Sequence, residues 1–153
     1  MKKILLTLAF VERENKILLG MKKRGFGVGR WNGFGGKVKK GEKIEEAVKR
    51  ELKEEVGILA KKIEHRGILN FVFDQNPDEI LKVHLFKVLD FEGEPRESEE
   101  MKPRWFRKEE IPFDKMWPDD KHWLPLFLSG KKIKGQFHFA DEDTLLDYEI
   151  KII

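Results

Sequence analysis

A predicted helix of this chain carries acidic side chains on its apolar face, and this limits the folds that the chain can adopt. From Lys43 to Val56 apolar residues recur every fourth position, and Gly57 is placed to end the helix. At about 100° per residue, Glu51 and Glu55 each lie within about 20° of Ile44, inside the apolar arc. Two carboxylates at the edge of a core are costly unless a cation compensates them, so the fold must supply one.

Two kinds of cation can meet this need. Glu54, about 80° from Ile44, borders the same arc and can add a third oxygen ligand. Sites made of several carboxylates suit magnesium or manganese. Arg50, about 120° from Ile44, offers the alternative of a salt-bridge network without any metal. The residues alone leave both interpretations open.

Composition limits the class of protein. A chain of 153 residues fits one domain, expected over residues 1–153 and as a monomer. The 31 Lys and Arg residues are interspersed with 28 Asp and Glu residues, which does not favour stable nucleic-acid binding. The absence of cysteine excludes disulfides, thiolate zinc sites and a cysteine nucleophile.

The N-terminal apolar run does not have the form of a targeting segment. Residues Ile4 to Val11 follow two lysines, but Glu12-Arg13-Glu14 closes the run without a cleavage site, so we expect a buried first strand. No stretch approaches the roughly 20 apolar residues that span a bilayer. We therefore expect a soluble, cytoplasmic protein with no membrane association.

The remaining pattern predicts a mixed α+β domain. A glycine-rich loop over residues 22–36 and a polar loop over 93–102 separate the expected elements. The expected strands and the second helix are, in chain order, strands 4–11, 17–21, 63–74, 80–91 and a short one around 105–106, a helix from 119 to 128, and a closing hairpin of strands 134–140 and 144–152.

The spacing around the acidic helix resembles a known family signature. The matching residues are Gly36, Glu42, Arg50-Glu51-Leu52, Glu54-Glu55 and Gly57-Ile58. They resemble the complete Nudix box, with no fixed position missing. The resemblance implies a Nudix fold, a mixed β-sheet sandwiched by helices (α/β/α), with its acidic helix at about 43–57.

The same resemblance implies the metal chemistry. Glu51, Glu54 and Glu55 would hold Mg²⁺, with Mn²⁺ as a second possibility, and Gly36 would belong to the same metal site. Gly36 would also allow the strand-to-loop bend, and Arg50 would orient a glutamate. Glu100 would join the metal site and compete with Glu54 for the role of general base. Water would then attack a nucleoside triphosphate in line, releasing the monophosphate and pyrophosphate.

Similarity beyond the box points to a substrate class. The segments that carry it are 20–38, Glu100-Met101, Trp105-Phe106, 111–113, 116–120 and 146–148. They resemble the animal-type oxidised purine nucleoside triphosphatases, which cleave 8-oxo-dGTP and 2-hydroxy-dATP and so sanitise the nucleotide pool. The small-molecule nucleotide would be the partner of this chain.

Base selection is expected from Asn32, Asp119 and Asp120, with Trp117 as a stacking face. Two adjacent aspartates that converge on one ligand do not both ionise easily, so one would donate while the other accepts. The alternative for Asp119 is a simple helix cap. Lys22 is expected at the phosphates, or as an ordinary exposed lysine.

By resemblance Thr7, Phe26, Phe71, Phe73 and Trp123 would line the base pocket, although core packing is the commoner use of aromatic residues. The sequence leaves two rival functions open. One is Nudix hydrolysis of another nucleoside diphosphate derivative, and the other is a noncatalytic module that binds nucleotides. Asn32, Asp119 and Asp120 disfavour the first, and the intact set of box glutamates disfavours the second.

Overall fold

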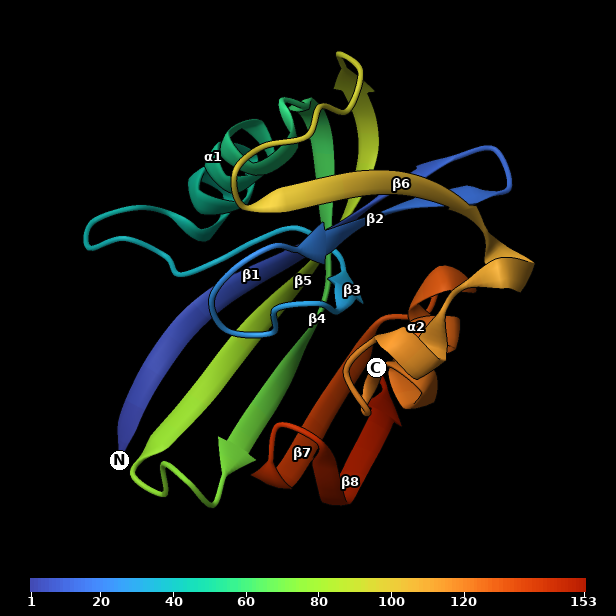
Figure 1. The fold of residues 1–153 in the computed structure, drawn as a ribbon. Coiled ribbons are helices and arrows are strands. Elements are labelled where there is room, and N and C mark those ends of the chain that lie inside the picture. The colour runs from blue at the N-terminus through green and yellow to red at the C-terminus, as the bar shows by residue number, and fades with distance from the viewer.

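A computed structural model describes residues 1–153, and it is built around one strongly curled sheet (Figure 1). The sheet has eight strands in the order β3-β2-β1-β5-β4-β7-β8, with β6 paired to β2. β1 runs parallel to β5 and β4 parallel to β7, while the other pairs are antiparallel. The strands are β1 (Lys2–Arg13), β2 (Lys16–Lys22), β3 (Trp31–Asn32), β4 (Leu59–Phe73), β5 (Glu79–Glu92), β6 (Met101–Arg107), β7 (Ile133–Asp141) and β8 (Thr144–Ile152).

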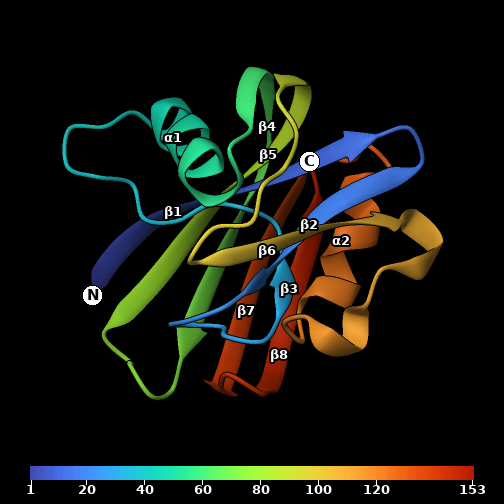
Figure 2. The ribbon, with the colours of Figure 1, turned by 45° about the horizontal axis from the view of Figure 1, so that its top comes forward.

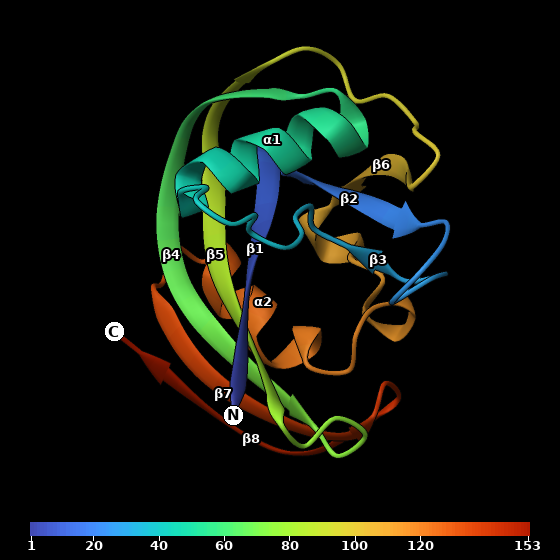
Figure 3. The ribbon, with the colours of Figure 1, turned by 90° about the vertical axis from the view of Figure 1, so that its left-hand side faces the viewer.

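The two α-helices, α1 (Ile44–Val56) and α2 (Asp120–Leu128), cover opposite faces of this sheet. Successive side chains of a strand point to opposite faces. Accordingly Ala9 and Phe86 belong to the core cluster that contains the apolar residues of α1, while Phe10 and Leu85 belong to the cluster of α2. In Figure 3, β4 and β5 curve around both helices, with α2 inside the curl. Two 3₁₀ turns, Lys108–Glu110 and Phe113–Lys115, connect β6 to α2.

Helix α1 has the boundaries that the sequence predicts. Lys43 is its N-terminal cap residue, and Gly57 ends it with a φ of 72°, a left-handed conformation that favours glycine. Glu45 and Glu46 lie in the first turn, where negative charge suits the helix dipole. At the other end the backbone N–H of Arg96 donates to the Val56 carbonyl over 2.9 Å, which ties the 93–100 loop to the helix.

Strands β4 and β5 begin earlier than the sequence pattern predicts, at Leu59 and Glu79 rather than at Ile63 and Ile80. The register of this pair shifts between Ala60 and Lys62, again before Ile63, and again between His65 and Gly67. Each irregularity interrupts the alternation of inward and outward side chains. The sequence does not predict the first residues of β4, because apolar and polar residues do not alternate there with a period of two.

The 22–36 segment contains strand pairing where the sequence predicts only a loop. Trp31–Asn32 pairs with β2 as strand β3 (Figure 2). Phe34 pairs with Ala9 of β1. A Cβ on Gly35 would lie 1.9 Å from the Thr7 carbonyl oxygen, so only glycine permits this approach. Strand β6 likewise begins at Met101, before the predicted Trp105, because it pairs with β2 along its whole length. None of the helices has the length and apolar character that crossing a bilayer requires.

Candidate active site

A cavity of about 190 Å³ opens on the α2 side of the sheet. Its walls come from β1, β4, β5, the glycine-rich segment and the start of α2. All the residues predicted to bind substrate line it, namely Thr7, Lys22, Phe26, Asn32, Phe71, Phe73, Trp117, Asp119, Asp120 and Trp123. The chain therefore brings together residues from distant parts of the sequence at one concave site.

Aromatic side chains form one wall of the cavity. Phe26, 55% exposed, lies with its ring 4.9 Å from that of Trp117. Phe71 stacks on Phe137 and Phe73 on Phe139, with ring centroids 5.1 and 5.0 Å apart. Phe71 and Phe73 thus pack against the core on one side and border the cavity on the other, and their contact with a base stays a prediction.

Asp119 and Asp120 are buried at one end of the cavity, with 2% and 3% of their surface exposed. Asp119 Oδ2 accepts a 2.7 Å hydrogen bond from Trp123 Nε1. Asp119 occupies the cap position of α2 but makes no side-chain cap hydrogen bond, so the capping alternative is wrong. Asp120 Oδ2 is buried without a partner, which leaves it free for a ligand.

The two aspartates differ in their affinity for protons. Burial raises the pKa of Asp119 to about 6, although the Trp123 hydrogen bond opposes the rise. Burial also raises the pKa of Asp120, and the negative charge of Asp119 raises it further. Asp120 is therefore the member of the pair that favours the protonated, donor form, and Asp119 is the member that favours the ionised, acceptor form.

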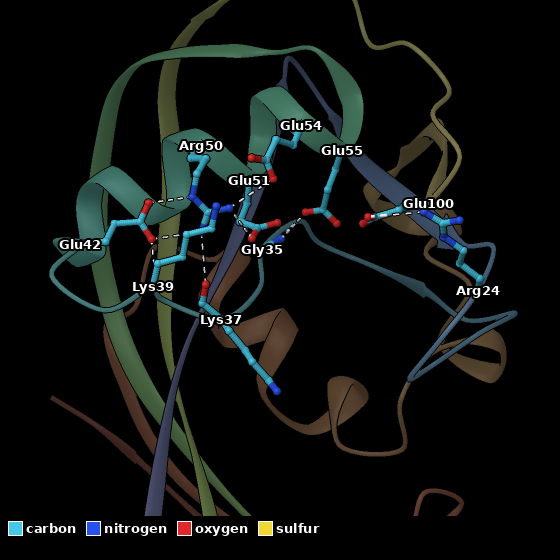
Figure 4. Close-up of polar contacts among 10 residues, drawn as sticks. All are labelled: Arg24, Gly35, Lys37, Lys39, Glu42, Arg50, Glu51, Glu54, Glu55 and Glu100. Atoms are coloured by element: carbon cyan, nitrogen blue, oxygen red, sulfur yellow. Dashed lines mark hydrogen bonds and ion pairs between the residues drawn. The ribbon is translucent and has the colours of Figure 1, made fainter.

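At the other side of the sheet, Arg50 organises three of the acids (Figure 4). It donates to both oxygens of Glu42, with Nε to Oε2 at 2.7 Å and Nη2 to Oε1 at 3.0 Å. Its Nη1 contacts Glu51 Oε1 at 2.9 Å and Glu54 Oε2 at 3.2 Å. The hydrogen bonds that Arg50 donates to Glu42, and then the one from the Lys39 N–H, lower the pKa of Glu42 to about 2. The salt-bridge network considered from the sequence therefore exists.

Glu55 lies outside that network. Its side chain is 2% exposed and accepts a 2.8 Å hydrogen bond from the Gly35 N–H. Burial first, and then the charge of Glu51, raise the pKa of Glu55 to about 8. In Figure 4 the Glu100 carboxylate lies toward that of Glu55, and its charge adds to the rise. Glu100 itself is half exposed, with Arg24 Nη2 at 3.9 Å.

The carboxylate oxygens of these acids are the kind of ligand that a divalent cation prefers, although the side chains do not converge on one point. Glu55 is buried without any cationic side chain bonded to it, and a Cβ on Gly36 would lie 2.8 Å from Glu51 Oε1, so the glycine makes room beside that carboxylate. No three acidic or histidine side chains converge as metal ligands. Glu54, 55% exposed, can turn away from Arg50 to supply a further oxygen.

Comparison with known proteins agrees with this geometry. The NUDIX domain model matches residues 4–127, and the chain therefore belongs to the Nudix family. Oxidized purine nucleoside triphosphate hydrolases from Mus musculus and Danio rerio are 50% and 47% identical to it. The alignments cover 96% and 95% of this chain and 94% and 93% of those proteins. A MutT protein from Bacillus halodurans superposes with a TM-score of 0.83 at 30% identity, over 97% of both chains. The predicted Nudix fold is confirmed.

Several residues of the cavity were not predicted from the sequence. Leu6, Leu8, Leu81 and Val83 line it from one face of β1 and β5, and their alternation along each strand was a usable signal. Arg30 also lines the cavity. Its partners lie far away in the sequence, so no local pattern could have identified it.

Proposed function

We propose that this Nudix hydrolase cleaves oxidised purine nucleoside triphosphates of the 8-oxo-dGTP and 2-hydroxy-dATP class to the monophosphate and pyrophosphate. Such an activity would sanitise the nucleotide pool. The names of the mouse and zebrafish relatives support the substrate class, since the identity extends over nearly the whole chain. The buried aspartate pair supports it independently, on chemical grounds.

One cavity reaches from the aspartate pair to the two glycines that contact carboxylates of the acidic helix, and this observation carries the proposal. Asp119 and Asp120 line one part of it, and Gly35 and Gly36 line another. Gly35 donates its N–H to Glu55, and Gly36 abuts Glu51. A nucleotide with its base at the aspartates would therefore extend its phosphates toward the carboxylates of α1.

The aspartate pair provides the base recognition. An oxidised guanine carries an N7 donor where guanine has an acceptor. Ionised Asp119 can accept from such a donor, while protonated Asp120 can donate to a neighbouring oxygen. Trp117 offers the stacking face, and the Asn32 amide oxygen is held by the Gly33 N–H over 2.8 Å, which fixes the orientation of that amide.

For the phosphate end we propose Mg²⁺, with Mn²⁺ as the alternative, on Glu51, Glu54, Glu55 and Glu100 beside Gly36. A bound divalent ion would neutralise phosphate charge and acidify water there. Glu54 is our proposed general base, with Glu100 as its competitor. Arg50, whose Nη1 donates to Glu51 Oε1 over 2.9 Å, is the residue proposed to orient a glutamate. Lys22, which lines the cavity, is the proposed side-chain contact for a phosphate.

The test is a panel of triphosphates and related compounds assayed for pyrophosphate release. We expect 8-oxo-dGTP and 2-hydroxy-dATP to be cleaved with a higher kcat/KM than dGTP and dATP, and chelation to stop the reaction. A preference for a nucleotide sugar or a dinucleoside polyphosphate would favour the rival Nudix activity instead. Nucleotide binding without turnover would favour a noncatalytic module.

Two further expectations accompany the proposal, namely that the protein acts as a monomer and in the cytoplasm on free nucleotides. Light scattering during size-exclusion chromatography tests the first, and fractionation of the source cells tests the second. A stable dimer, or enrichment in a membrane or organelle fraction, would contradict them.

A further inference from the structure

Arg30 lines the cavity and contacts both another lining residue and a turn that lies outside the cavity lining. Its guanidinium carbon lies 4.4 Å from the ring centroid of Trp117. Nη2 donates to Asp143 Oδ1 over 2.5 Å, and Nη1 donates to the Glu142 carbonyl oxygen over 2.9 Å. Glu142 and Asp143 form the turn between β7 and β8, so the contact joins residues 113 positions apart. Only 19% of the Arg30 side chain is exposed.

Both ends of this connection are themselves held in place. The Arg30 N–H donates to the Gly27 carbonyl and its own carbonyl accepts from the Lys22 N–H, each over 3.1 Å. In the turn, the Asp143 N–H donates to Asp141 Oδ1 over 2.9 Å. A planar guanidinium fixed in this way restricts the plane of the indole that it covers.

The charge of Arg30 acts on the same end of the cavity. The charged residues lining the cavity are Lys22, Arg30, Asp119 and Asp120. The Arg30 charge lowers the pKa of both aspartates, against the larger effect of burial. Without it the pair would hold its protons more tightly.

We propose that Arg30, anchored by the turn at Asp143, is a positioning residue for base recognition. It fixes the stacking face of Trp117 and places a positive charge in the cavity that the aspartate pair also lines. The inference rests on the proposed function for its consequence in catalysis, whereas the contact with Trp117 can be tested without any substrate.

Replacing Arg30 separates its two effects. Arg30→Gln should raise KM for 8-oxo-dGTP about tenfold, since the cation–π contact is lost, while kcat changes far less. Its pH profile of kcat/KM should also move to higher pH, because a cation near the aspartates is gone. Arg30→Lys keeps the charge but not the planar contact, so KM should rise while the profile stays at its wild-type position. If Arg30 had a purely structural role, its replacement would change the free energy of unfolding without separating the effect on KM from the effect on the pH profile.

The chain offers a matched control. Arg13 lies over Trp105 at 4.8 Å and over Phe91 at 5.2 Å, and it pairs with Glu94 at 3.6 Å, outside the cavity. Arg13→Gln removes the same kind of contact and should leave KM and the pH profile unchanged. Asp143→Asn weakens the anchor at a side chain that is 85% exposed, so it should fold normally and raise KM in the same direction as Arg30→Gln.

A second readout uses the indole N–H resonances of the four tryptophans in a ¹⁵N-labelled sample. Loss of one resonance in Trp117→Phe identifies that of Trp117. Arg30→Gln and Asp143→Asn should shift this resonance, and Arg13→Gln should not. Wild-type KM and pH profile in Arg30→Gln, or an unshifted Trp117 resonance in Arg30→Gln and Asp143→Asn, would overturn the inference. If the wild-type protein cleaves no oxidised purine triphosphate, the proposed function fails, and the resonance shifts still decide whether Arg30 positions Trp117.

Discussion

The indole N–H of Trp123 donates a hydrogen bond to Asp119 Oδ2 over 2.7 Å inside the protein core. Trp123 is fully buried, one helical turn after Asp119. This bond favours the ionised form of Asp119, while Asp120 has no such donor at its buried Oδ2. One tryptophan thereby helps to decide which aspartate accepts and which keeps the proton.

Trp123→Phe should therefore change the pH dependence of catalysis. Loss of the N–H donor raises the pKa of Asp119, so the acidic limb of kcat/KM, expected near the Asp119 pKa of about 6, should move to higher pH. The unsatisfied Asp119 oxygen should also lower the free energy of unfolding by about 1–3 kcal/mol. A pH–rate series and urea unfolding measure the two effects. An acidic limb that stays in place would show that the bond does not set the ionisation of Asp119.

Asp120→Asn should remove the alkaline limb of the same profile. The amide stays neutral and remains a donor, whereas Asp120 loses its proton and its donor role at high pH. The variant should also gain stability relative to the wild type as pH rises. Because the folded-state pKa of Asp120 is raised above 3.8, the native wild type binds more protons than its unfolded form from about pH 4 up to that raised pKa. Wild-type stability falls across this window, and the Asn variant avoids its share of the fall. Parallel stability curves for the two proteins would contradict the assignment.

Glu55→Gln tests whether the buried carboxyl group of Glu55 in α1 lacks a compensating cation. Without divalent ions, wild-type stability should fall relative to the variant as pH rises from 4.5 to about 8, because the native carboxyl keeps a proton that the unfolded chain has released. The slope should be at most about 1.4 kcal/mol per pH unit. Added Mg²⁺ should raise the Tm of the wild type more than that of the variant. Glu45→Gln, at an exposed acid of the same helix, is the control and should follow the wild type.

Glu54→Gln should reduce pyrophosphate release by about 100-fold or more if Glu54 is the general base. The Glu54 side chain is 55% exposed, so the fold should be retained, with an unchanged thermal melt. Glu100→Gln should reduce the rate less. The reverse order of the two variants would assign the base to Glu100.

The acidic helix was predictable from sequence because its geometry is local. A fixed rotation per residue puts Glu51 and Glu55 on the inner face, and the structure has them 14% exposed at the side chain and 2% exposed overall. The same rotation puts Glu54 at the edge, where its side chain is half exposed. The C-terminal boundary of the helix is also predicted from a local signal, Gly57.

The remainder depends on contacts that local patterns do not encode. Arg30 meets Asp143 only because the curled sheet brings the β7–β8 turn beside the glycine-rich segment. Asp119, which the sequence offered as a helix cap, accepts its hydrogen bond from the indole of Trp123 one turn later and makes no cap bond. The irregular start of β4 reflects pairing with β5 through shifts in register, which no period reveals.

The most direct measurement is a crystal structure of Glu54→Gln with 8-oxo-dGTP and Mn²⁺, recorded at the manganese absorption edge. We predict one nucleotide in the cavity, with its base against Asp119 and Asp120 and an anomalous peak beside Glu51 and Glu55. A base bound elsewhere, or an acidic cluster still held by Arg50 with no peak beside it, would contradict the proposal that a single cavity joins base recognition to metal-dependent hydrolysis.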